Sequence, residues 1–149
     1  MSEAQVAAIG AFAVLALNGA AAAFAGLRWW QVAPSRAVWP LLRAGQVAAG
    51  LQALLAGVLF VAGYRPDDEL FWLYALLPVA IGVIAEQLRI VSAEQVLENR
   101  GLPDAQAVGE LSETEQRSVV LAVVRREIGV MALAALTVTF LALRAALIA

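Results

Sequence analysis

Four apolar segments, each close to the length needed to cross a lipid bilayer, dominate the sequence. They cover residues 4–27, 38–64, 69–91 and 125–148. A bilayer core is about 30 Å thick, and a helix needs about 20 apolar residues to cross it. Because lipid offers no partner for backbone polar groups, helices are the favoured spanning structure. The sequence predicts an all-α integral membrane protein, a bundle of four antiparallel transmembrane helices.

Composition supports the bilayer as the solvent of this chain. Hydrophobic residues make up 62% of the 149 positions, whereas about 45–50% is typical of soluble domains. A soluble domain of this length has too little interior to hide so much apolar surface. The net charge of −2 provides no broad basic surface for nucleic acid. We expect a single transmembrane domain, residues 1–149, with no nucleic-acid partner.

The chain contains no cysteine and no histidine, and all ten cationic residues are arginine. Disulfides, zinc sites of the Cys/His type and haem held by histidine therefore lack their ligands. Activated nucleophiles that need His, Cys or Lys are excluded as well. Only a carboxylate pair, Glu86 with Glu94 or Glu127, remains for acid–base chemistry, and no spacing singles one out. We expect no enzyme activity, no catalytic residue, no metal and no cofactor.

Charged residues gather at the ends of two apolar segments. Glu86 and Arg89 close the third segment, and Arg125, Arg126 and Glu127 open the fourth. A helical hairpin would place both groups at one depth, where unpaired charges are costly. We predict that these five residues form a charge network that holds the two helices in register. The alternative is that Glu86 is the ion- or proton-coupling carboxylate of a small transporter or channel.

The third segment also carries residues at four-residue steps. Tyr74, Pro78, Gly82 and Glu86 trace a slowly drifting stripe on a helix, and Pro78 is expected to kink it. Asn18 lies in the middle of the first segment. If the protein has a cavity, we expect Asn18, Tyr74, Pro78 and Gly82 to line it.

Small residues form a ridge along the second segment. Gly45, Ala49, Ala53 and Gly57 recur every four residues, and small residues permit the close packing that drives helix association in lipid. We predict a helix-packing seam, used within one chain or between chains.

A helical period continues beyond the third segment, to Gly101. Ser112 and Glu115 then have the spacing of a capping box that starts the last helix. Residues 92–124 are therefore predicted to form a helical hairpin that projects from the membrane.

Arginine placement predicts the orientation. In a four-span topology one face holds eight arginines and the other holds Arg65 and Arg144. The eight are Arg28, Arg36, Arg43, Arg89, Arg100, Arg117, Arg125 and Arg126. Loops rich in arginine and lysine usually lie on the cytoplasmic side of a membrane. We therefore expect a multi-pass protein of the cell membrane with a cytoplasmic hairpin and both termini outside. The N-terminus has no positive n-region, although small residues before position 26 leave processing of residues 1–25 open.

These features favour a non-catalytic membrane protein that acts through helix packing. It would be an accessory or scaffold subunit, or a homo-oligomer, whose hairpin meets another membrane protein or a second copy. Anionic lipid headgroups are a further candidate partner, at Arg117, Arg125 and Arg126. The small transporter or channel that uses Glu86 remains the alternative function.

Overall fold

The computed structural model describes all residues, 1–149, and contains only helices as regular elements. The helices are α1 (Glu3–Trp30), α2 (Val38–Ala62), α3 (Leu70–Asn99), α4 (Ala105–Gly109) and α5 (Glu113–Leu147). By length and composition, α1, α2, α3 and α5 can each cross a membrane. The predicted all-α class and the four apolar helices are confirmed.

Local sequence explains where the helices begin and end. Ser2 and Gln5 form a capping box at the start of α1, and Ser112 and Glu115 form the predicted one at the start of α5. α3 ends just before Gly101, whose φ of 68° lies in the left-handed region that glycine adopts without strain. The expected glycine stop after α3 is thus confirmed.

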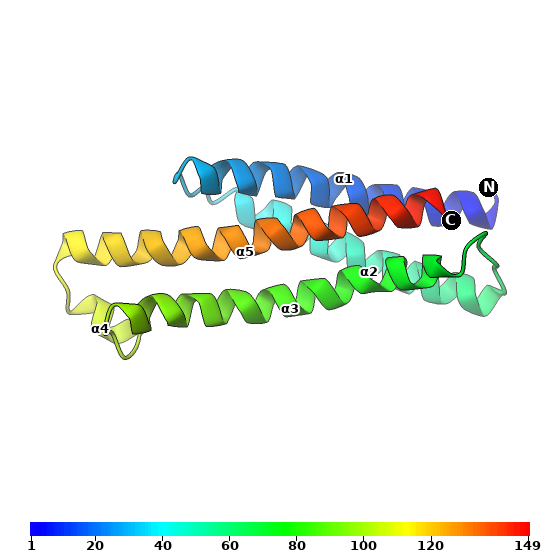
Figure 1. Cartoon of the computed structure of the whole chain (residues 1–149). Helices are drawn as coiled ribbons and strands as arrows, with labels where there is room; N and C mark the ends of the chain where they lie inside the picture. Colours follow the sequence, from blue (N-terminus) through cyan, green and yellow to red (C-terminus); the bar gives the residue numbers. More distant parts are fainter.

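The four long helices pack in a ring. α1 and α3 each contact α2 and α5, while α2 and α5 barely touch. The α1–α5 and α3–α5 contacts are the most extensive, and the α2–α3 contact is the least extensive of the four sides. Figure 1 shows both chain termini at one end of the bundle.

The interior of the ring is built mainly from small side chains. The large side chains that are fully buried are limited to Phe71, Ile128, Val14 and Val38, and most other buried positions are alanine. Many Leu, Val, Ile and Phe side chains are exposed on the outer faces. Close packing on small residues with apolar groups outside is typical of helices that associate in lipid.

α3 and α5 continue past the ends of α1 and α2 and are joined there by α4 (Figure 1). Their 30 and 35 residues correspond to lengths of about 45 and 52 Å at 1.5 Å per residue. Val96 and Val119 are buried in this projecting part. Both terminal nitrogens of the Arg100 guanidinium donate to Ser118 Oγ at 3.2 Å. The projecting part therefore has an apolar contact and a polar contact of its own.

Candidate functional site

Glu86, on α3, is the acceptor at the centre of a partly buried polar cluster, in which Arg43 is exposed. Its Oε1 accepts hydrogen bonds from Arg43 Nη1 at 2.6 Å and from Gln46 Nε2 at 2.9 Å, both on α2. Its Oε2 accepts a hydrogen bond from Arg89 Nε at 3.1 Å, one turn along α3. Hydrogen bonds that involve charged groups are the stronger kind. Glu86 is therefore bound from two helices at once.

Arg89 extends the cluster to a third helix. Its Nη1 donates to Glu127 Oε1 on α5 at 3.3 Å, and its guanidinium lies 5.5 Å from the ring centre of Trp39 on α2. The side chains of Glu86, Arg89 and Glu127 are only 16–26% exposed. We name Arg43, Gln46, Glu86, Arg89 and Glu127 the Glu86 cluster.

The charges of the Glu86 cluster balance. It contains two arginines and two glutamates, and each forms at least one ion pair within it. An unpaired charge at this depth would be costly, so a neutral set is the arrangement that a half-buried position requires. The cluster connects α2, α3 and α5 where α3 and α5 begin to project beyond the bundle.

Arg125 and Arg126 lie outside the Glu86 cluster, although the sequence grouped them with it. Arg125 stacks over Trp29 at 5.4 Å from the ring centre, and Arg126 Nη2 donates to Gln95 at 3.1 Å. The reason is the helical rotation of about 100° per residue. Three consecutive residues on α5 point in three directions, and only Glu127 faces Arg89.

Arg43 and Gln46 are members that sequence reasoning missed. They lie three residues apart, which places them on one face of α2, and Arg43 Nη1 also donates to Gln46 Oε1 at 2.6 Å. That spacing was an available signal. Arg43 was counted among the eight arginines of one face, and no pairing across helices was predicted for it.

A cavity of about 250 Å³ lies beside the cluster and is lined by residues of all four long helices. Asn18, Pro78 and Gly82 line it, together with Gln46 and Glu86. Tyr74 does not line it and packs instead against an apolar group around Tyr64 and Phe71. Four-residue steps drift by about 40° each on a helix of 3.6 residues per turn, so Tyr74 and Glu86 do not share a face.

Asn18 is a buried polar residue that lines the cavity. It is 4% exposed, and its Nδ2 donates to Val14 O at 3.0 Å and to Gly45 O at 3.1 Å. The second bond crosses from α1 to α2. Asn18 thus holds two helices together at a position that also faces the cavity.

The residues of the predicted seam have different environments. Gly45 and Ala49 are buried, Ala53 is half-buried and Gly57 is exposed. A Cβ atom at Gly45 would lie 2.8 Å from Asn18 Oδ1, whereas one at Gly57 would meet nothing within 4 Å. Close approach is therefore required at Gly45 and not at Gly57.

No group of three or more carboxylates comes together to hold a metal ion. Comparisons of the chain with protein-family models, curated protein sequences and solved structures found no match. The function of this chain is therefore inferred from its own side chains.

Proposed function

We propose that this chain is a non-catalytic integral membrane protein that acts through helix packing, as an accessory or scaffold subunit or as a homo-oligomer. The supporting observation is that Glu86 already accepts hydrogen bonds from Arg43, Gln46 and Arg89. A carboxylate that binds two arginines and an amide is suited to fixing helices. Carrying an ion would require those contacts to break.

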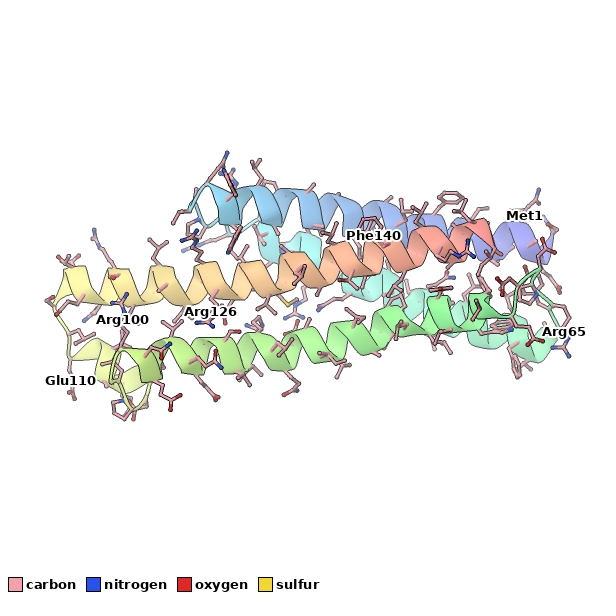
Figure 2. The ribbon with its side chains drawn as sticks, in the orientation of Figure 1. Met1, Arg65, Arg100, Glu110, Arg126 and Phe140 are labelled. Atoms are coloured by element: carbon pink, nitrogen blue, oxygen red, sulfur yellow. The ribbon has the colours of Figure 1, made fainter.

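The topology that accompanies this proposal has four antiparallel transmembrane helices. Residues 92–124 form a cytoplasmic hairpin, and both termini lie outside the cell membrane. The eight-to-two division of the arginines supports this orientation. In Figure 2, Arg100 and Arg126 lie toward the projecting end, and Arg65 lies at the opposite end, where Met1 also lies.

A reporter fused to the C-terminus tests the orientation. Alkaline phosphatase, which is active only outside the cytoplasm, should be active at Ala149 and inactive when inserted after Gly109, the last residue of α4. A fluorescent protein that matures only in the cytoplasm should give the opposite pattern. Phosphatase activity at Gly109 would contradict the proposed orientation.

The hairpin is the proposed contact surface for a partner. Val120 and Leu121, on the projecting part of α5, are 54% and 39% exposed. They line a groove of about 650 Å³ between α5 and the turn that joins α1 to α2. Apolar side chains exposed outside the apolar spans are typical of interaction surfaces.

Affinity purification of the full chain from its native membrane, with cross-linking, tests the scaffold proposal. We expect one stoichiometric membrane-protein partner or a defined homo-oligomer. Changing Val120 and Leu121 together to serine should remove that association, whereas Val91→Ser, at an exposed valine that ends the third apolar segment and lies outside this groove, should retain it. A chain that remains monomeric and uncross-linked in its native membrane would contradict the proposal.

A small transporter or channel that uses Glu86 is the second candidate. The cavity of about 250 Å³ favours it, because Glu86 and Gln46 line the same space as Asn18. Liposomes that contain the purified chain distinguish the two proposals. Proton- or cation-coupled flux that Glu86→Gln abolishes without lowering the unfolding temperature would support transport, and a chain that carries no flux supports the scaffold.

A further inference from the structure

A long groove runs along the outer face of the bundle between α1 and α5. It has a volume of about 750 Å³. Its α1 side consists of the small residues Gly19, Ala22, Ala23 and Gly26, followed by Trp29. Its α5 side runs from Arg126 to Thr139. We call it the α1–α5 groove. It is apolar along its length and has an arginine and a tryptophan at one end.

The length of the groove matches one leaflet of a bilayer. Gly129 and Thr139, which line it, are separated by about 15 Å along a helix that rises 1.5 Å per residue. That is about half of a bilayer core of 30 Å. Trp29 and Arg126 lie at the end where a membrane–water interface is expected, because aromatic and basic side chains are enriched there.

Three arginines at this end have no carboxylate partner. Arg28, Arg125 and Arg126 are absent from all four ion pairs of the structure. Arg28 and Arg125 rest on aromatic rings, and the buried Nε of Arg28 has no hydrogen-bond partner. Arg126 donates one hydrogen bond to an amide oxygen. Arg117, also expected to meet lipid, pairs with Glu113 at 2.7 Å instead.

We propose that the α1–α5 groove binds one anionic phospholipid from the leaflet on the hairpin side. One acyl chain lies against the small residues of α1, and the phosphate is bound by Arg125 and Arg126. Charge complementarity supports this occupant, because unpaired guanidinium groups at the interface attract anionic headgroups. The small residues provide the space for the chain.

A second copy of the protein is a poorer occupant of the same groove. Two copies in one membrane are related by an axis along the membrane normal, so a two-fold contact brings identical patches together. Arg125 and Arg126 of both copies would then face each other at the same depth. The resulting repulsion disfavours self-association through this face, whereas a lipid phosphate neutralises it.

Native mass spectrometry of the full chain in detergent tests the proposal, with an equal mixture of phosphatidylglycerol and phosphatidylcholine that have identical acyl chains. We expect wild type to retain phosphatidylglycerol in preference to phosphatidylcholine. Changing Arg125 and Arg126 together to glutamine should reduce that preference by about 30-fold, which corresponds to about 1 kcal/mol for each of the two arginines.

Filling the groove provides a second variant that leaves the charges in place. A Cβ at Gly26 meets nothing within 4 Å, so Gly26→Leu should occupy the groove without disturbing the bundle and should reduce binding of both lipids. Gly57→Leu, on α2 outside the groove and equally unobstructed, is the matched control and should bind like wild type.

Three results would overturn the proposal. They are equal retention of the two lipids by wild type, equal lipid binding by Gly26→Leu and Gly57→Leu, and a dimer that Gly26→Leu dissociates. The last result would identify a second copy as the occupant.

Discussion

Gln52 is a buried amide without hydrogen-bond partners. It lies on α2 with 4% of its surface exposed, and neither its Nε2 nor its Oε1 has a partner. The side chain lies against Gly10 of α1. An amide buried without hydrogen bonds costs free energy that an apolar group of similar shape does not. Gln52 therefore weakens the contact between α1 and α2 in which it lies.

Replacing Gln52 by methionine should stabilise the protein. Methionine is unbranched and of similar length to glutamine, and the substitution removes the unpaired amide. We therefore expect the free energy of unfolding to rise by about 1–2 kcal/mol. Thermal unfolding in detergent measures the effect.

Gln46→Met is the matched control for this change. The same substitution there removes a hydrogen bond to Glu86 at 2.9 Å and should lower the unfolding temperature. A lower unfolding temperature for Gln52→Met would mean that the Gln52 amide has a partner or a role of its own.

At the scale of helices, the face of α2 that packs inward follows alternating steps of three and four residues. The buried residues are Val38, Leu42, Gly45, Ala49, Gln52, Ala56 and Leu59. Steps of this kind keep a stripe on one side of a helix, as in coiled coils. The small-residue ridge at strict four-residue steps instead drifts around the helix and reaches the outer face at Gly57.

Substitution of the two end glycines of that ridge should have opposite results. Gly45→Ala places a Cβ 2.8 Å from Asn18 Oδ1 and should destabilise the bundle by about 1–3 kcal/mol, the usual cost of overpacking. Gly57→Ala meets nothing within 4 Å and should be neutral or stabilising by about 1 kcal/mol, because alanine is the better helix former. Thermal unfolding of both variants in one detergent checks this, and equal unfolding temperatures would contradict the packing described for α2.

The helices themselves were predictable from the sequence because length and hydrophobicity decide them locally. The four apolar segments, the Ser112 capping box and the stop at Gly101 all depend on neighbouring residues. Contacts between helices depend on the rotation of each helix about its axis. A change of one residue changes that angle by about 100°, which separates Glu127 from Arg125 and Arg126.

Contacts between helices also decide which members of the Glu86 cluster could be predicted from the sequence. Glu86 and Arg89 were predicted together because they lie one turn apart on one helix, a relation that the sequence contains. The partnership with Arg43 and Gln46 spans 43 and 40 positions of the chain. It exists because α2 lies beside α3 in the ring, and the sequence does not specify that neighbour.

At the scale of the whole molecule, the Glu86 cluster joins three of the four long helices where the bundle ends and the projecting part begins. Removing one member leaves charged partners without a counterion in a half-buried position. The cluster should therefore stabilise the whole bundle. This structural role of Glu86 is the central claim of the proposed function.

Thermal unfolding and liposome flux of Glu86→Gln, measured on the same preparation, test that claim most directly. Glu94→Gln, an exposed glutamate of α3 outside every ion pair, is the control. We expect Glu86→Gln to lose about 1.5–3 kcal/mol of stability, as for hydrogen bonds to charged groups, with Glu94→Gln unchanged and no flux through wild type. An unchanged unfolding temperature for Glu86→Gln, together with a proton or cation flux that only wild type carries, would contradict the claim.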